Sequence, residues 1–280
     1  MIRLKCGSLA LVVAALFTST LRAEDEPKPV RALLVIGGGY HDYGKQKDIL
    51  TKGISARANV QWTIAYDTDT TDKHLNPIYE KDDWAKGFDV VVHDECMAAV
   101  KDLKVIERIL KPHRDGLPAV ILHCGMHSCR SEGWPKTTPW FEFTGLHTTG
   151  HGPQAPIEVA YTDKESPITK GLEDWKTVNE ELYNNITGKL LETAQPLARG
   201  KQTYKVKDAE KVEETIVVWT NTYNGKAKVF GTTLGHNNGT VGDERYLNLV
   251  ARGLLWSVGK LDNVYLTPSK KVLLDEPAVK

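Results

Sequence analysis

The stretch that decides the fold covers residues 118–128 and reads Pro-Ala-Val-Ile-Leu-His-Cys-Gly-Met-His-Ser. A buried strand that turns sharply at a small residue and enters a helix presents the nucleophile in several α/β hydrolases. Here His123 stands two residues before Gly125, and Cys124 is next to the glycine. An imidazole at such a turn carries protons or binds metal, but it is a poor hydrolytic nucleophile. We therefore expect an α/β protein with a histidine at the turn after a central strand.

Short, nearly continuous runs of Val, Ile and Leu recur on the N-terminal side of this stretch, as is typical of strands buried on both faces. We predict strands over residues 30–36, 60–66, 88–92 and 119–122, with helices over residues 45–58 and 101–113. Strands that alternate with helices build a parallel sheet with right-handed crossovers. This half of the chain thus predicts a parallel sheet flanked by helices.

The second half of the chain has more alternating patterns and more turn residues. It predicts strands over residues 157–161, 215–219 and 227–233, and a last helix over residues 243–259. Together with the first half, these elements make one α/β domain, residues 24–260. Residues 261–280, which include Pro268 and Pro277, are expected to form an extended C-terminal tail that wraps the surface or is partly disordered.

Residues 1–23 have the layout of a secretory signal peptide. Arg3 and Lys5 precede an apolar run over residues 9–17, and Ala23 leads into the acidic residues 24–26. The run is too short for a transmembrane helix, and no later segment reaches the roughly 20 apolar residues that a membrane span needs. We predict a periplasmic or secreted protein without a membrane span after signal removal. An uncleaved N-terminal anchor is the alternative.

The composition is that of a globular protein without a basic surface. The 280 residues include 36 Lys and Arg against 36 Asp and Glu, and 41% of residues are hydrophobic. A net charge of zero provides neither the basic field that nucleic acid requires nor a polybasic surface for anionic lipid. Nucleic acid is therefore not expected as a partner.

Three cysteines remain once the signal is removed, namely Cys96, Cys124 and Cys129. An odd number allows at most one disulfide within the chain. A bond between Cys124 and Cys129 requires a turn that brings their Cα atoms within about 7 Å. Otherwise these two residues are expected to be small, buried and apolar in character.

Polar residues follow several predicted strands at the point where each strand ends. Five of the nine histidines lie within a few residues of such an end: His41, His93, His123, His127 and His236. In an open parallel sheet the ligand lies beyond the carboxyl ends of the strands. We expect His123, His127 and His236 to converge on one cleft there, with His41 at its rim.

Residues 37–42 read Gly-Gly-Gly-Tyr-His-Asp and follow the first strand. Gly38 and Gly39 would let the backbone approach a polar substrate, with His41 and Asp42 pointing into the cleft as catalytic residues. A tight turn with an exposed His-Asp pair is the alternative. The run is not a dinucleotide turn, because the third glycine is missing and no acidic residue follows the second strand at the expected distance. Neither NAD nor flavin is expected.

Glu181 lies in a turn-rich segment that could fold over the carboxyl edge of the sheet. A carboxylate beside several imidazoles is what a divalent metal such as zinc, or a general base, requires. The candidate ligands are His123, His127, Glu181 and His236, which are also candidate catalytic residues. A solvated glutamate at the start of a strand is the alternative interpretation.

Two further residues are candidates for substrate binding. Trp134, in a proline-broken loop, could stack on a sugar ring, although packing in the core or in a lid is the alternative. Asn237 could form hydrogen bonds with sugar hydroxyls, although Asn-Asn-Gly is also strong turn chemistry.

Taken together, several motifs resemble the ThuA-like family, which is named for trehalose utilisation. They are Gly-Gly-Gly-Tyr-His-Asp at 37–42, His-Cys-Gly-Met-His-Ser at 123–128, Asn-Glu-Glu-Leu-Tyr at 179–183, Val-Phe-Gly-Thr-Thr-Leu-Gly-His at 229–236 and Arg-Gly-Leu-Leu-Trp-Ser-Val-Gly at 252–259. The resemblance covers about residues 32–259 in the same order.

The resemblance implies a flavodoxin-like sheet of the class I glutamine amidotransferase type, without the elbow cysteine of those enzymes. His123 stands at the elbow position, and His236 falls where those enzymes have their catalytic histidine. It also implies catabolism of disaccharides through 3-keto sugars, and a metal site. Export departs from the cytoplasmic setting of the trehalose pathway.

The combined prediction is an exported ThuA-like protein that acts on a small carbohydrate by proton transfer next to a carbonyl or by metal-assisted hydrolysis. One alternative is a cysteine hydrolase that uses Cys124 with His236. The other is a noncatalytic carbohydrate-binding protein that has kept the fold.

Overall fold

The computed structural model describes residues 27–184, 190–270 and 274–275, and its core is one ten-stranded sheet. The strand order is β10-β2-β1-β3-β4-β9-β8-β7-β5-β6. From β10 to β9 the neighbours are parallel, and from β9 to β6 they are antiparallel. The prediction of a flanked α/β sheet is confirmed. The prediction that the sheet is simply parallel is wrong, because the longest ladder, between β7 and β8, is antiparallel.

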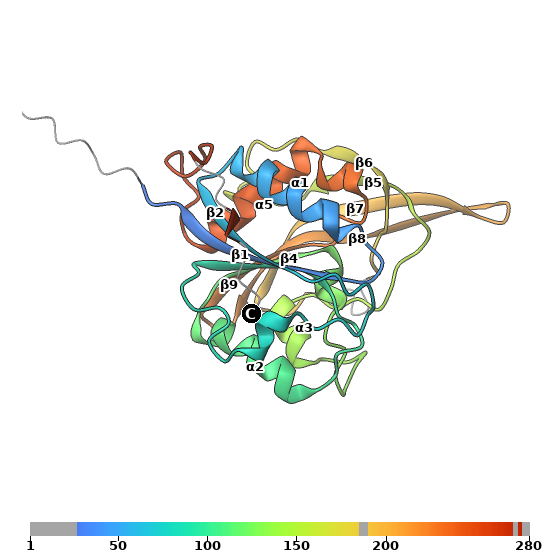
Figure 1. Cartoon of the computed structure of the whole chain (residues 1–280). Helices are drawn as coiled ribbons and strands as arrows, with labels where there is room; N and C mark the ends of the chain where they lie inside the picture. Colours follow the sequence, from blue (N-terminus) through green and yellow to red (C-terminus); the bar gives the residue numbers. More distant parts are fainter. Residues whose placement is uncertain (1–26, 185–189, 271–273, 276–280) are drawn as a thin grey trace, which may run out of the picture.

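The parallel half is built from strands that are buried on both faces. Its strands are β1 (Val30–Gly38), β2 (Val60–Tyr66), β3 (Val90–Cys96), β4 (Ala119–Leu122), β9 (Ala227–Thr232) and β10 (Leu274–Asp275). Helices α1 (Tyr43–Ser55) and α5 (Glu244–Ser257) cover one face, and α2 (Leu103–Asp115) and α3 (Pro139–Thr144) cover the other (Figure 1). In β1, Leu34 and Ile36 face the first pair of helices, whereas Leu33 and Val35 face the second.

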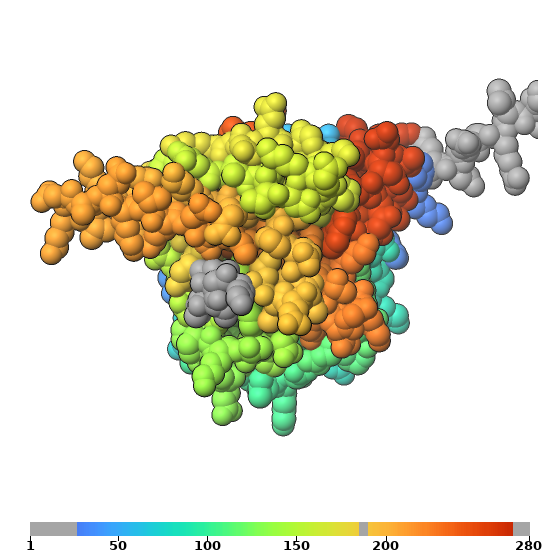
Figure 2. All heavy atoms as spheres, turned by 180° about the vertical axis from the view of Figure 1, so that it is seen from behind, coloured from blue at the N-terminus to red at the C-terminus, as the bar shows by residue number. Residues whose placement is uncertain are grey.

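The antiparallel half consists of β5 (Ala155–Tyr161), β6 (Trp175–Glu180), β7 (Ala194–Val206) and β8 (Ala209–Tyr223). The hairpin of β7 and β8 projects far from the body of the molecule (Figures 1 and 2). The sequence predicted only residues 215–219 of this hairpin. Its outer part, with cross-strand partners such as Lys201 and Glu214, is mostly polar and therefore lacks an alternating apolar pattern.

The short elements lie close to the carboxyl edge of the parallel strands. They are η1 (Pro77–Glu80), η2 (His123–His127) and α4 (Asn238–Val241). The predicted elbow is present, but the chain enters a 3₁₀ turn rather than an α-helix. A Cβ atom on Gly125 would lie 2.7 Å from the carbonyl oxygen of His93, so only glycine allows η2 to pack this closely on β3.

The ends of the chain differ in how much the structure describes. The predicted signal peptide, residues 1–23, lies outside the described residues. Past residue 260, the Ser269 hydroxyl bonds to the carbonyls of Ala58 and Val60, and β10 pairs with the edge strand β2. This part of the tail therefore packs along the sheet. Among the described residues, every helix is too short or too polar to cross a membrane.

Candidate functional site

His123 occupies the elbow between β4 and η2 with a φ of 41°, a left-handed conformation that turns its ring out of the strand. Its Nδ1 lies 2.6 Å from the carbonyl oxygen of Thr233. A carbonyl oxygen only accepts hydrogen bonds, so Nδ1 carries the proton. The remaining ring nitrogen, Nε2, lies 3.0 Å from the hydroxyl oxygen of Tyr183.

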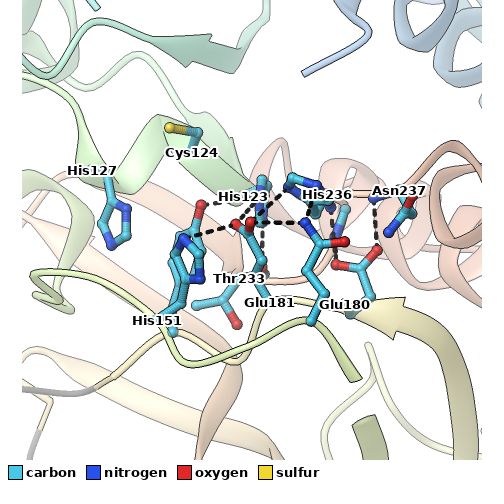
Figure 3. A network of polar contacts seen from close by, with 12 residues as sticks. His123, Cys124, His127, His151, Glu180, Glu181, Thr233, His236 and Asn237 are labelled. Carbon is cyan, nitrogen blue, oxygen red and sulfur yellow. Dashed lines mark hydrogen bonds and ion pairs between the residues drawn. The ribbon is translucent and has the colours of Figure 1, made fainter. Parts of the chain in front are cut away.

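Glu181 lies at the centre of a group of three imidazoles (Figure 3). Its carboxylate is 3.5 Å from His123 Nε2, 3.4 Å from His151 Nε2 and 3.2 Å from His236 Nδ1. Burial opposes ionisation, but hydrogen bonds with His123 and His236, and the charges of His123 and His151, hold the pKa of Glu181 well below its usual range. The group therefore has a fixed negative charge at its centre.

The loop that carries His236 is held by a buried carboxylate. Glu180 is fully buried, and it accepts hydrogen bonds from the backbone N–H groups of Gly235, His236 and Asn237 at 3.4, 3.0 and 2.9 Å. The Gln46 amide donates to the carbonyls of Gly235 and His236. The imidazole of His236 is thus positioned from both sides. Its hydrogen bond with Glu181 raises the pKa of His236.

His41 completes the group from the loop after β1. Its ring centroid lies 4.7 Å from that of His123 and 4.9 Å from that of His236. Burial, and then the charges of His123 and His236, lower the pKa of His41 to about 2, so the ring is neutral. Its Nδ1 is buried without a hydrogen-bond partner.

Ligand atoms of His41, His123 and His236 all lie within 4.8 Å of one another, close enough to share one ion. The ring therefore lies within the group rather than at a rim.

His127 is separate from this group. Its ring stacks on Tyr183 with a centroid distance of 4.0 Å, and Nε2 contacts the hydroxyl of Thr148. Burial, and then the nearby Arg130, hold the pKa of His127 well below its usual range. The structure therefore brings His41, rather than His127, together with His123 and His236. The catalytic role of His127 stays a prediction.

The other predicted residues lie around the group rather than in it. Asp42 is half-exposed and binds Lys45 Nζ at 2.8 Å and the Asn238 amide at 2.9 Å. The Asn237 amide donates to the carbonyl of Asn179, and Trp134 packs on the guanidinium of Arg130. Their roles in substrate binding stay predictions.

The glycine run has a packing reason of its own. A Cβ atom on Gly38 would lie 2.2 Å from the carbonyl oxygen of Cys96, and one on Gly39 would lie 3.1 Å from that of Thr70. The end of β3 therefore lies against Gly38, and the loop after β2 lies against Gly39. Their contact with substrate stays a prediction.

The elbow cysteine is bonded to a residue at the end of β3. Cys96 and Cys124 form a disulfide with a Cα–Cα distance of 5.2 Å, while Cys129 is free and buried. The pairing of Cys124 with Cys129 is therefore not formed. A disulfide sulfur is not a thiolate nucleophile, so the cysteine hydrolase alternative finds no support in this arrangement.

Sequence reasoning missed several residues of the site. His151 and Gln154 come from a loop of threonine, glycine and histidine that carries no strand signal, and Gln154 donates to Glu181 at 3.3 Å. Tyr183 lies in the motif at 179–183, but nothing in the sequence indicated its bond to His123. Tyr183 also lines a cavity of about 250 Å³ with Asn184, Arg199 and residues 213–216. The imidazole group lies beside this cavity and does not line it.

A comparison with known families identifies the chain. The model of the ThuA family, described as trehalose utilisation, matches residues 31–257. The chain belongs to the ThuA family. No curated protein matches.

Solved structures with this fold include two other ThuA-like proteins. One, from Parabacteroides merdae, has 21% sequence identity and a TM-score of 0.58, with 89% of this chain and 95% of that one covered. Another, from Bacteroides uniformis, has 15% identity and a TM-score of 0.56, with 82% and 93% covered. The glutaminase domain of CTPS from Trypanosoma brucei, with bound acivicin, has 10% identity and a TM-score of 0.43, with 88% and 100% covered. The two ThuA-like proteins thus share the fold of this chain.

Proposed function

We propose that this ThuA protein is an exported enzyme of carbohydrate catabolism, and that the open cluster, defined as His41, His123, His236 and Glu181, carries its chemistry. The family description, trehalose utilisation, supports a sugar substrate. The observation that carries the proposal is the convergence of three imidazoles, within 4.8 Å of one another, beside an ionised carboxylate. Such a combination is rare in a structural role, because it leaves the Nδ1 atom of His41 buried without a partner.

The open cluster fits a divalent ion such as zinc. Neutral imidazoles and a carboxylate are the ligand types that zinc prefers. His41 Nδ1 has no hydrogen-bond partner, and His123, whose Nδ1 is engaged with Thr233, has Nε2 available as a ligand atom. We propose that His41, His123 and His236 hold the ion, with Glu181 beside them. His41 thus takes the place of His127 in the predicted ligand set. When bound, the ion would polarise a sugar carbonyl or a water molecule.

The remaining steps use groups of the chain itself. When no ion is bound, the raised pKa of His236 suits a proton carrier near neutral pH, and Glu181 orients its ring. Tyr183, whose pKa is raised by burial and by Glu181, stays protonated, and its hydroxyl oxygen can accept a hydrogen bond from a sugar hydroxyl while it contacts His123. Polar side chains around the cavity beside Tyr183, such as Arg199 and Glu213, are suited to the hydroxyls of a saccharide. We therefore expect proton transfer next to the carbonyl of a keto sugar, or hydrolysis.

Export is part of the proposal. The signal-like residues 1–23 predict it, and the disulfide between Cys96 and Cys124 is of the kind that persists in oxidising compartments such as the periplasm. A periplasmic or secreted enzyme would meet disaccharides, or their oxidised keto forms, before uptake.

The proposal is tested by turnover of disaccharides and their 3-keto derivatives in deuterated water. We expect wild-type protein to exchange the hydrogen next to the keto carbon for deuterium, or to release a monosaccharide, and we expect His123→Gln to do neither. His147→Gln is the matched control, since His147 is buried with both ring nitrogens unpaired but lies outside the open cluster. Binding of these sugars without any reaction would contradict the proposal and favour a noncatalytic binding protein.

A further inference from the structure

Two groups of metal-ligating side chains share His41. Besides the open cluster, the ligand atoms of His41, Cys96 and Cys124 also lie within 4.8 Å of one another. Cys96 is the last residue of β3, and Cys124 lies in η2 directly after the elbow histidine. Both cysteines are buried, with 2% and 5% of their surface exposed. The disulfide that joins them therefore lies against the imidazole group.

We propose that Cys96, Cys124 and His41 form a second site for a zinc-like divalent ion, which the disulfide keeps closed. Two thiolates and one imidazole are a ligand set that zinc and cobalt(II) bind well. The Nδ1 atom of His41 is buried without a partner and is therefore available as a third ligand. Three protein ligands leave the fourth tetrahedral position open to water.

Opening this site requires a reductant. A trialkylphosphine breaks the S–S bond and is itself oxidised to the phosphine oxide, with the oxygen atom taken from water. The two protons of that water go to the sulfurs, so Cys96 and Cys124 each become a thiol. The divalent ion then displaces both thiol protons, which are released to solvent.

The third cysteine provides a matched control. Cys129 is fully buried. Its burial, and to a lesser extent the nearby charge of Glu95, hold the pKa of its thiol well above the usual value. It therefore stays a thiol that neither ionises readily nor binds metal. Among the described residues, the group of ligand atoms around Cys96 and Cys124 does not include the sulfur of Cys129.

The two sites compete for one imidazole. An ion on the two thiolates would take His41 from the open cluster, so the oxidation state of the disulfide decides where an ion can be held. The inference rests on ligand geometry alone and does not require the proposed function.

The test uses the full chain, purified without chelator, then reduced with a trialkylphosphine under nitrogen and titrated with Co²⁺ alone. We expect a near-ultraviolet thiolate-to-cobalt charge-transfer band that saturates at about one ion per chain. Oxidised wild type, Cys96→Ser and Cys124→Ser should lack the band, whereas Cys129→Ser and His123→Gln should keep it. His41→Gln should weaken Co²⁺ binding at least about tenfold, because it removes a ligand.

A reduced wild type without the band would overturn the inference, as would a band of equal strength in Cys96→Ser or unchanged affinity in His41→Gln. A second measurement needs no variant: Zn²⁺ should slow alkylation of Cys96 and Cys124 in the reduced wild type, as mapped on peptides, and absence of that protection would also overturn it. Failure of the proposed function is distinguishable, since a sugar-inactive wild type could still show the thiolate band.

Discussion

The molecule contains two buried groups of histidine and glutamate, and they differ in whether any nitrogen is left for a ligand. On the face covered by α2, the closed cluster consists of His93, Glu95, His113 and Tyr79. His93 Nδ1 lies 2.8 Å from Glu95 Oε1, and His93 Nε2 lies 3.1 Å from His113 Nε2. His113 Nδ1 donates to the carbonyl of Leu117 at 2.8 Å. Every imidazole nitrogen of this cluster is therefore used inside the protein.

The two groups also differ in their exposure to solvent. The closed cluster is fully buried against the rings of Trp84, Trp140 and Phe143. In the open cluster the side chain of His236 is 16% exposed, and the Nδ1 atom of His41 has no partner. Satisfied polar networks specify a fold, whereas an unpaired lone pair near solvent is free to bind or to carry a proton. The comparison teaches that a group of histidines and carboxylates identifies a functional site only when the geometry leaves a ring nitrogen without a partner inside the protein.

The largest expected effect lies in the closed cluster. Glu95→Ala should lower the free energy of unfolding by about 3–5 kcal/mol, because it leaves the buried His93 without its charged partner. Glu181→Ala should cost clearly less, since solvent can reach His151 and His236 beside it, whose side chains are 38% and 16% exposed. Denaturant unfolding of both variants measures the difference. Equal losses would mean that the two clusters are equally structural.

The next effect should be seen in catalysis. His236→Gln keeps much of the volume of the side chain but removes proton transfer and metal ligation, so turnover of the sugar identified above should fall roughly a hundredfold or more. Its thermal stability should change little. His147→Gln, the matched buried histidine, should keep wild-type turnover. A His236→Gln protein with full activity would place this histidine with the structural ones.

The smallest expected effect for a change of one pH unit is a pH dependence of stability that comes from the closed cluster. Burial, and then the charge of His93, lower the pKa of His113 to about 3. Between the usual imidazole pKa of about 6.5 and that value, the unfolded chain binds a proton that the folded chain does not, so stability falls as pH falls. The slope from His113 should reach about 1.4 kcal/mol per pH unit.

Denaturant unfolding at a series of pH values checks this slope. His113→Gln should flatten the acid side of the profile. His236→Gln should not, because the raised pKa of His236 contributes stability that is complete below its unfolded pKa and is lost as pH rises through the folded pKa. An acid slope that is unchanged in His113→Gln would contradict the assignment.

The comparison also explains what the sequence could predict. The elbow was predictable, because a run of apolar residues ends at His123 and small residues follow. His93 was wrongly placed after a strand: β3 continues to Cys96, and the polar pair His93 and Glu95 inside it bonds to Tyr79 and His113. These partners come from other elements, so no local pattern reveals them.

The open cluster was predicted in part for the same reason. His123, His236 and Glu181 lie beside strand ends, where topology brings residues together. His41 and His127 follow strand ends equally, yet only the ring of His41 turns toward the group. His151 comes from a loop, and its position depends on a bridge to Tyr183 that the sequence does not show. Side-chain direction after a strand is set by loop packing, which a periodic pattern does not encode.

The most direct test of the account is the divalent-metal content of the oxidised protein, purified without chelator or reductant. Elemental analysis should find about one ion per chain in wild type and in His147→Gln, and almost none in His123→Gln or His236→Gln. The account would be contradicted by a wild type that binds no ion even when zinc is supplied. An ion that persists at full occupancy when His123 and His236 are replaced together would contradict it equally.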